Sequence, residues 1–366
     1  MPRSELDELR AAVRDYLGKA SSSQTVREVM STEHGYQDAV WRQMANELGL
    51  HGIAVPEQWG GAGAGMPELA VVFEEMGAAL LCAPFFSTVA LATTALLASA
   101  DEEAVGEFVP AFVDGSVTAT LILNDRLDAW DAESVTLTAR RVDGGYRVTG
   151  ESSMVLDGHT ADVILAAANT ERGPSLFALA SDAPGLRRRP LAGLDRTRKV
   201  AHLTFQDVPA RLIGTEDGAA AALQRTSDIA ALALAAEQLG AAQRCLDMAV
   251  DYAKSRIQFG RAIGSFQAVK HRCTDMLILV EGARSAVTHA AEVVDTDEFA
   301  VAVSVAKMAC SEALLQVSVD NLRVHGGIGF TWEHDGHLYV RRAKASELML
   351  GSPDFHAQRL AALVAL

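Results

Sequence analysis

The sequence is short of cysteine and has no long apolar run. Its four cysteines are widely spaced and form no Cys-x-x-Cys pair, so we expect buried, reduced thiols rather than disulfides or a zinc site. No segment reads as a bilayer span, and the first residues lack the features of a signal peptide. These absences predict a cytoplasmic protein that binds neither a membrane nor a metal.

Basic residues are also scarce relative to acidic ones. The chain has 32 lysines and arginines against 47 aspartates and glutamates, which gives a formal net charge of −15 at pH 7. Such a charge argues against nucleic acid as a partner, because binding to a phosphate backbone needs a basic face. An anionic ligand would need a local group of basic residues against this background.

The order of predicted elements divides the 366 residues into three parts. Residues 1–113 show apolar residues at helical spacing, residues 114–214 show the β-branched alternation of short strands, and residues 215–366 return to long helices. Asp143-Gly-Gly145 is a strong signal for a hairpin turn in the middle part. The predicted class is α+β: an N-terminal helical domain, a middle antiparallel β-barrel or sandwich, and a C-terminal helical bundle.

In the last part, apolar residues recur at alternating steps of three and four, which predicts the buried seam of a bundled helix. The seam residues are Phe266, Val269, Cys273, Met276, Val280, Ala283 and Val287. Two further long helices, expected at about 299–324 and 337–350, complete a four-helix bundle.

A first candidate ligand site is the segment Arg256-Ile-Gln-Phe-Gly260, which is followed by Ser265-Phe-Gln267 at the next helix start. Arg256 offers planar, bidentate donors for a diphosphate. Phe259 offers a flat aromatic face, and Gly260 allows the chain to turn. Taken alone, the same string is compatible with an ordinary helical turn that carries a solvated arginine.

A second candidate is Val324-His-Gly-Gly-Ile-Gly-Phe330, in which Gly326 and Gly327 expose backbone N–H groups that suit phosphate oxygens. Arg323, just before this segment, is placed to reach a phosphate as well. A glycine cap between two helices explains the same residues, and the two roles are compatible.

These two segments resemble the flavin-holding parts of acyl-CoA dehydrogenases, and Arg341-Arg-Ala-Lys-Ala-Ser-Glu-Leu-Met-Leu-Gly351 resembles the closing helix of that family. The helical–β–helical order is similar to the family over essentially the whole chain. The resemblance implies α,β-desaturation of an acyl-CoA substrate with FAD, a flavin site that crosses a subunit boundary, and an electron-transfer flavoprotein as acceptor. It places FAD contacts on Arg256, Phe259, Gly260, Gln267, Arg323, Gly326 and Gly327, where Arg323 replaces the family's usual glutamine.

The sequence departs from the family at the catalytic base. Desaturation needs a carboxylate within reach of the α-carbon, and the family's two positions for it fall on Leu350 and Ala230. Neither side chain accepts a proton. Glu347, one turn before Leu350 on the same helix face, is a substitute candidate.

Other acids have ordinary structural explanations. Glu237 is expected to make a buried polar contact within the bundle, and Asp228 is expected to be solvated at a helix start. Glu333 and Asp335 are expected to cap the next helix.

The middle part departs from the family as well. Active members carry a Thr-Glu-Pro-Gly-Ala-Gly-Ser-Asp-like run and a Trp-Ile-Thr/Ser strand against the flavin ring. Here the corresponding segments are Leu123-Asn-Asp-Arg-Leu-Asp-Ala-Trp130 and Ser153-Met-Val-Leu-Asp157. Most groups that hold the ring are therefore missing, and Trp130 is either a substitute ring neighbour or an ordinary tryptophan.

Three interpretations remain. In the first, the chain is the base-lacking half of an α2β2 acyl-CoA dehydrogenase, as in actinobacterial enzymes for steroid side-chain CoA esters, and a homologous subunit supplies the base. In the second, it is a self-sufficient homodimer or homotetramer with a displaced base such as Glu347. In the third, it is a non-catalytic scaffold. The retained phosphate-type segments argue against the third, and the lost base and ring contacts favour the first.

Overall fold

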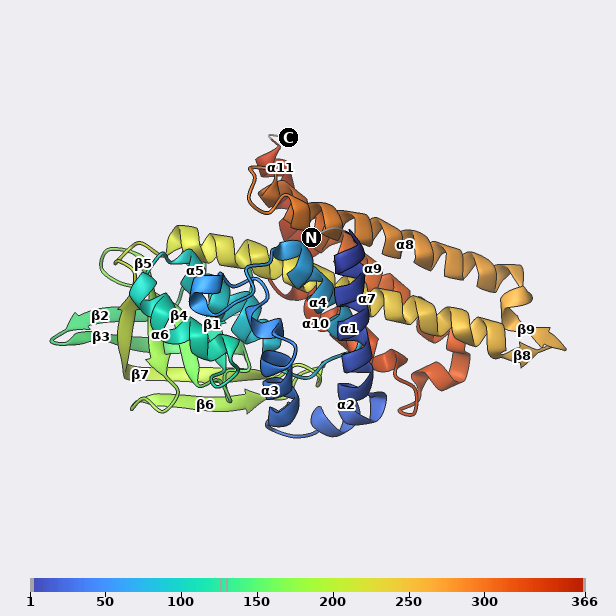
Figure 1. Cartoon of the computed structure of the whole chain (residues 1–366), viewed down its shortest axis with the longest axis horizontal. Coiled ribbons are helices and arrows are strands. Elements are labelled where there is room, and N and C mark those ends of the chain that lie inside the picture. The colour runs from blue at the N-terminus through green and yellow to red at the C-terminus, as the bar shows by residue number, and fades with distance from the viewer. Residues whose placement is uncertain (1–2, 126, 130, 365–366) are drawn as a thin grey trace. The chain divides into compact units, whose positions relative to one another are not determined.

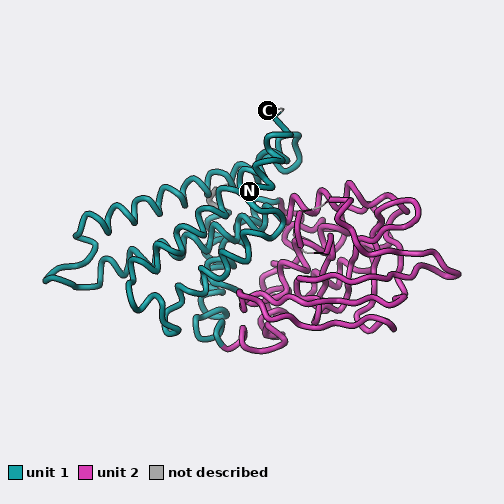
Figure 2. Tube along the Cα trace, turned by 180° about the vertical axis from the view of Figure 1, so that it is seen from behind, with its two compact units in different colours: residues 1–27, 66–81, 231–366 teal, residues 28–65, 82–230 magenta. Residues whose placement is uncertain are grey.

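The computed structural model describes residues 3–125, 127–129 and 131–364. Trp130, the candidate ring neighbour, lies outside the described residues. The chain forms two compact units that interleave along the sequence (Figure 2). Unit 1 contains Met1–Arg27, Met66–Leu81 and Ala231–Leu366, and unit 2 contains Glu28–Gly65 and Cys82–Ala230. The domain boundaries at 113/114 and 214/215 stay a prediction.

Unit 2 is built around a seven-stranded sheet with the order β1–β4–β2–β3–β7–β5 (Figure 1). Strand β6 pairs with β7, and β4 also pairs with β5, so the path from β4 through β2, β3, β7 and β5 returns to β4 and closes as a barrel. The strands are β1 Ala119–Ile122, β2 Thr138–Val142, β3 Gly145–Leu156, β4 Val163–Asn169, β5 Pro174–Ala180, β6 Leu186–Leu191 and β7 Val200–Ile213.

The barrel confirms the predicted β domain with one correction to its strand directions. Most pairs are antiparallel, but β4 runs parallel to β1 and, at a single position, to β2. The β2–β3 hairpin lies between β1 and β4 in the sequence, and this long connection allows the chain to return in the same direction. The predicted turn joins β2 to β3, with Gly144 at φ 84° and Gly145 at φ 150°.

The interior of the barrel is apolar because alternate residues of each strand point inward. Its buried core comprises Ile122, Leu137, Ala139, Tyr146, Val148, Val155, Ile164, Ala166, Ala168, Phe177, Leu179, Ala201, Leu203, Phe205 and Val208. The helices of unit 2 are α3 Asp38–Asn46, α5 Thr94–Ala98 and α6 Glu102–Val113, and a π-helical segment, Phe86–Thr93, precedes α5. Asp101 caps α6 by accepting a hydrogen bond from Ala104 N at 3.0 Å.

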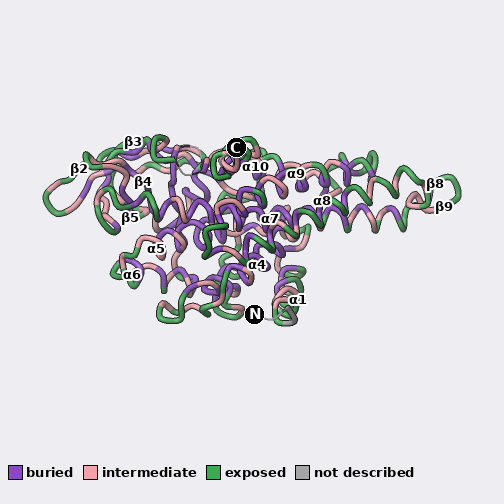
Figure 3. Tube along the Cα trace, turned by 90° about the horizontal axis from the view of Figure 1, so that it is seen from above, coloured by how far each residue is buried: buried purple, intermediate pink, exposed green. Residues whose placement is uncertain are grey.

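Unit 1 is a bundle of long helices. Its helices are α1 Arg3–Ala20, α2 Ser23–Val29, α4 Met66–Ala78, α7 Ala220–Ser255, α8 Gln267–Glu292, α9 Phe299–His325, α10 Gly336–Leu348 and α11 Pro353–Leu363. The last residues of α2, from Glu28, and the first residues of α7, up to Ala230, are assigned to unit 2. The C-terminal half of the predicted α8 seam, Met276 to Val287, is buried, whereas Phe266, Val269 and Cys273 are half-buried. The expected four-helix bundle is therefore confirmed. At the end where α8 begins, next to β8 and β9, its residues are more exposed than farther along the helix (Figure 3).

Glycine allows α4 and α7 to cross with their backbones in contact. A Cβ added at Gly240 would lie 1.7 Å from the carbonyl oxygen of Glu74, and one at Gly77 would lie 1.9 Å from that of Glu237. No side chain fits at either position, so this contact fixes where the N-terminal part of the chain joins the bundle.

One helix of unit 1 is long and apolar enough to cross a membrane by length and composition. It covers Phe299–Phe330, and 56% of its most apolar window is buried inside the protein. This burial is typical of the central helix of a bundle, and α9 packs against α8, α10 and α11.

Candidate functional site

A strained hairpin lies at the end of α7. Strands β8 (Ile257–Gln258) and β9 (Arg261–Ala262) are joined by Phe259 and Gly260, whose φ values are +52° and +75°. Two successive positive φ values define a tight hairpin turn that normally selects Gly, Asn or Asp. A phenylalanine here is costly, and it is 91% exposed, so the chain's own packing does not explain it.

The hairpin carries two aromatic side chains, Phe259 and Phe266, with the guanidinium groups of Arg256 and Arg261 on the same segment. The ring of Phe259 meets that of Phe266 edge-on, with their centroids 6.0 Å apart. Arg261 lies over the Phe266 ring at 4.1 Å, in a cation–π contact that holds this ring in place. The side chain of Arg256, at the start of the hairpin, is exposed.

The glycine turn after α9 contains Gly326, which the backbone conformation requires, and Gly327, which it does not require. Gly326 ends the helix at φ +66°, which favours glycine. Gly327 lies outside the left-handed region, and a Cβ added there would meet nothing within 4 Å. An external group that approaches the backbone closely explains a glycine at this position.

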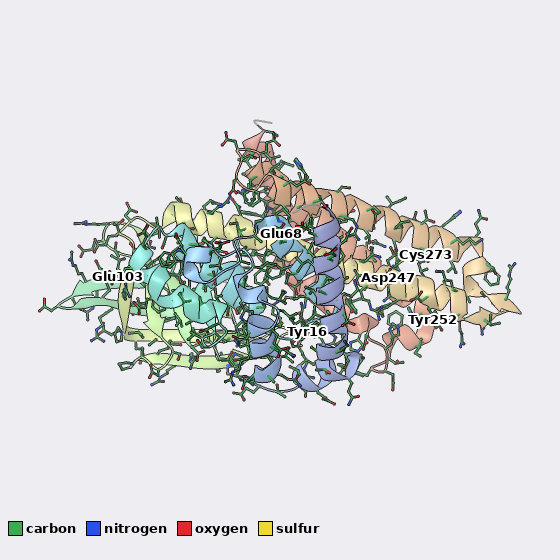
Figure 4. The ribbon with its side chains drawn as sticks, in the orientation of Figure 1. Tyr16, Glu68, Glu103, Asp247, Tyr252 and Cys273 are labelled. Atoms are coloured by element: carbon green, nitrogen blue, oxygen red, sulfur yellow. The ribbon has the colours of Figure 1, made fainter. Side chains whose placement is uncertain are left out.

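An aromatic stack brings the hairpin and the glycine turn together. Tyr252, near the end of α7 (Figure 4), stacks on His325 with a centroid distance of 4.3 Å, and His325 lies 4.1 Å from His334. Burial lowers the pKa values of His325 and His334, so both are neutral at pH 7. The stack places the start of the hairpin beside the turn without adding charge.

Two further predicted residues lie at the same end of the bundle. Arg323 is on the last turn of α9, where its side chain is 54% exposed and its Nη1 donates to Asp320 Oδ1 at 3.0 Å. Gln267 is the exposed first residue of α8, next to Phe266. The end of unit 1 therefore offers a flat ring, guanidinium groups and an exposed glycine backbone at Gly326 and Gly327, a set of groups that fits the adenosine diphosphate part of FAD.

The two base positions hold buried aliphatic side chains. Leu350 and Ala230 are both 0% exposed. Leu350 follows the end of α10 at φ +56°, in a left-handed conformation that leucine rarely adopts. Its carbonyl oxygen accepts a hydrogen bond from His356 Nε2 at 2.9 Å.

A buried lysine that the sequence analysis did not single out holds the same turn. The acceptors of Lys307 Nζ are Ser311 Oγ at 3.1 Å and the carbonyl oxygens of Ser346 at 3.2 Å, Glu347 at 3.3 Å and Gly351 at 3.1 Å. Burial lowers the pKa of Lys307 to about 8. The ammonium therefore binds backbone oxygens at the negative end of the α10 dipole, without a carboxylate contact in the described residues. A lysine inside the apolar run of α9 was the available sequence signal.

The remaining acids are placed as follows. The carboxylate of Glu347 pairs with Lys344 Nζ at 2.9 Å on the side of α10. Glu237 forms a buried ion pair with Arg342, which confirms the expected buried contact. Asp228 is buried rather than solvated. Asp335 does not cap α10 with its side chain, because its carboxylate instead accepts hydrogen bonds from Ser23 and Arg27 of α2.

In the barrel, the segment expected near the flavin ring carries a buried acid. Asp157, at the end of β3, accepts a hydrogen bond from Ser87 Oγ at 2.6 Å. Burial raises the pKa of Asp157 to about 6. Ser153 lies 2.8 Å from His202 Nδ1 on the outer face of the sheet.

Two family models match: "Acyl-CoA dehydrogenase, C-terminal domain" over residues 216–364 and "Acyl-CoA dehydrogenase, N-terminal domain" over residues 3–116. The acyl-CoA dehydrogenase IpdE2 of Mycobacterium tuberculosis is 34% identical over 361 residues, which is 98% of this chain and 97% of the relative.

Two solved structures at 30% identity or more are described by pairs of named proteins. A variant of the Tcur3481-Tcur3483 steroid ACAD matches with a TM-score of 0.89 and 34% identity, over 99% of this chain and 98% of that chain. The ChsE4-ChsE5 complex from Mycobacterium tuberculosis matches with a TM-score of 0.90 and 30% identity, over 100% and 98%. Butyryl-CoA dehydrogenase from Megasphaera elsdenii, at 23% identity and a TM-score of 0.90, shares the fold.

Proposed function

Because the chain belongs to the acyl-CoA dehydrogenase family, we propose that it is the base-lacking subunit of a hetero-oligomeric acyl-CoA dehydrogenase. A homologous partner carries the base, and this chain contributes the adenine end of the partner's FAD site. The reaction is α,β-desaturation of an acyl-CoA thioester. The proposal is carried by the two buried, non-ionisable side chains, Leu350 and Ala230, at the family's base positions.

The residues of this chain act on the end of the cofactor remote from the chemistry. FAD, when bound, would accept the hydride that leaves the β-carbon of the acyl chain. Arg256 would pair with the diphosphate, Phe259 would offer its face to the adenine, and backbone N–H groups of the glycine turn would donate to phosphate oxygens. Such contacts also explain why Phe259 is held exposed in a strained conformation.

Exposed apolar side chains at this end support a protein partner. The residues are Ile257 at 57%, Phe259 at 91%, Ile328 at 49%, Phe330 at 71% and Trp332 at 55% exposure. Soluble monomers rarely expose a large contiguous apolar patch. Two of the similar structures are described by pairs of named proteins, which favours a homologous partner over a second copy of this chain.

The alternatives are less well supported. A self-sufficient homo-oligomer would need a displaced base such as Glu347, and the carboxylate of Glu347 is paired with Lys344. A pure scaffold would need neither a glycine at 327 nor a left-handed phenylalanine at 259. The similarity to a steroid ACAD favours a bulky acyl group, and an electron-transfer flavoprotein is the acceptor that we propose.

The test is purification of this chain alone and with a base-bearing homologue encoded beside it. We expect flavin absorbance and acyl-CoA oxidation only for the complex, with one FAD per pair of subunits. A yellow, active enzyme from this chain alone would contradict the proposal, and loss of that activity in Glu347→Gln would then establish the displaced base.

The cofactor contribution is tested in the complex itself. We expect Arg256→Ala to release FAD, because the diphosphate loses its guanidinium partner, whereas Lys254→Ala, an exposed cation two residues earlier, retains it. Equal FAD content in the two variants would favour the scaffold.

A further inference from the structure

Asp320 is a nearly buried carboxylate that two arginines share. Its side chain is 7% exposed, and its Oδ1 accepts hydrogen bonds from Nη1 of Arg323 on α9 and from Nη1 of Arg272 on α8. Its Oδ2 accepts from Gln316 Nε2 at 2.7 Å. Burial opposes the charge, but the hydrogen bonds from Gln316, Arg323 and Arg272 outweigh it, so the pKa of Asp320 lies below its ordinary value. The carboxylate is therefore a permanent anion with both oxygens occupied.

Each guanidinium keeps N–H donors that do not bond to Asp320. Each arginine has five N–H donors, and within the described residues only Nη1 of each is engaged in a hydrogen bond. The side chains of Arg272 and Arg323 are 39% and 54% exposed. Two guanidiniums and one carboxylate leave a net charge of +1, in a chain whose formal net charge is −15.

A purely stabilising role accounts poorly for this arrangement. The guanidinium groups of both arginines are partly exposed, so solvent screens part of their attraction to Asp320. The second arginine adds a like charge beside the first, although Gln316 and Arg323 already bond to the two oxygens of the carboxylate. Two guanidiniums held side by side by one carboxylate are, in contrast, preorganised donors for a second, mobile anion.

The location of the pair indicates which anion it meets. Arg323 is three residues before Gly326, in the helix that ends at the glycine turn. A Cβ added at Gly327 would meet no atom within 4 Å, so the backbone of the turn is open to a ligand there. The stack of Tyr252 on His325 places the end of α7, which leads to Arg256, beside this turn. The cationic groups and the open backbone therefore border the same end of the bundle.

We propose that Arg272, Asp320 and Arg323 form one diphosphate-binding unit, in which both guanidiniums contact the diphosphate of FAD and Asp320 positions them. This inference rests on the proposed function and deepens it: Arg272 is a cofactor-binding residue that no family motif indicated, and Asp320 is a positioning residue. Arg323, which replaces the family's usual glutamine, would then act together with Arg272 of α8 through their shared partner Asp320.

The unit is tested by binding of ADP and of adenosine to the complex after FAD has been removed. We expect Arg272→Gln to weaken ADP binding about tenfold, which corresponds to about 1.4 kcal/mol, and to leave adenosine binding unchanged. Arg272→Lys restores part of the ADP affinity, since it restores the charge without the fork. Lys270→Gln, which removes an exposed cation from another face of α8, is the matched control and leaves both ligands unaffected.

Asp320→Asn separates positioning from simple electrostatics. If the carboxylate only repelled the diphosphate, its neutralisation would strengthen ADP binding, and that result overturns the proposal. We expect weaker ADP binding instead, because both guanidiniums lose their anchor, together with a smaller dependence of binding on salt for Arg272→Gln.

The outcomes distinguish this inference from the function on which it rests. If Arg256→Ala releases FAD but Arg272→Gln binds ADP as the wild type does, the unit is refuted and the proposed function stands. If Arg256→Ala also retains FAD, the cofactor does not lie at this end and both are refuted. Circular dichroism of Arg272→Gln and Asp320→Asn establishes that each variant is folded before binding is compared.

Discussion

The buried ammonium of Lys307 makes the stability of this chain depend on pH in a definite direction. Burial lowers its pKa from 10.5 to about 8. Between these values the unfolded chain binds more protons than the folded chain, and the free energy of unfolding rises with pH wherever this holds. The contribution of Lys307 is therefore least favourable below pH 8 and improves as the pH rises towards 10.5.

The magnitude follows from the pKa shift. Each pH unit within this window changes the free energy of unfolding by up to about 1.4 kcal/mol per proton. Since a change from about pH 7 to about pH 9 crosses the folded-state pKa of Lys307, we expect a gain of roughly 1.4 kcal/mol from this group. Lys307→Met keeps the length of the side chain and removes the titration.

The assay is urea unfolding of the wild type and of Lys307→Met at both pH values. Thiols and tyrosines that titrate in this range contribute equally to both proteins and cancel in the double difference. Lys344→Met, at an exposed lysine of α10, is the control and should follow the wild type. Parallel pH dependence of the wild type and Lys307→Met would refute the assignment of a depressed pKa to this lysine.

Further substitutions test the packing and the buried charges. Gly240→Ala should prevent stable folding, since its methyl group would overlap a backbone carbonyl, whereas Gly282→Ala, inside α8 with open space around it, should stabilise by up to about 1 kcal/mol in thermal unfolding. Arg342→Met should cost about 3–5 kcal/mol by removing the buried cation that pairs with Glu237, and the double replacement by methionine should recover most of it. For Asp157, whose folded-state pKa is raised to about 6, the folded chain binds the extra proton, so stability is lost as pH rises through 4 to 6. Asp157→Asn should therefore be more stable than the wild type at about pH 7.5 and similar to it near pH 4 in urea unfolding.

Features set by neighbouring residues could be predicted from the sequence. The alternating spacing of three and four between apolar residues, which continues through Val280 to Val287, predicted the buried side of α8. The glycines after Asp143 predicted the β2–β3 turn. The glycine-containing segments after α7 and α9 predicted where backbone and guanidinium groups are exposed, because exposure at a chain reversal is a local property.

Features set by distant residues could not. The parallel pairing of β1 with β4 depends on the route of the intervening hairpin. Asp335 was expected to cap a helix and instead binds Ser23 and Arg27, more than 300 residues away in sequence. Asp320 carried no signal of its own, since its importance comes from arginines on two helices. In each case tertiary contacts override the local preference.

The two ends of the proposed site differ in what holds them, and under the proposed function this difference explains how the base could be lost while the cofactor contacts are kept. The turn at Leu350 is fixed by Lys307 and His356 through backbone carbonyl oxygens. Those bonds are indifferent to the side chain at 350, so an acid can become leucine there without changing the turn. At the proposed adenine end, the proposed contacts depend on the side chains of Arg256 and Phe259 themselves, and both side chains are exposed. A strained, exposed phenylalanine is more easily explained by an external ligand than by the fold, and the surrounding groups fit the proposed flavin of a partner subunit.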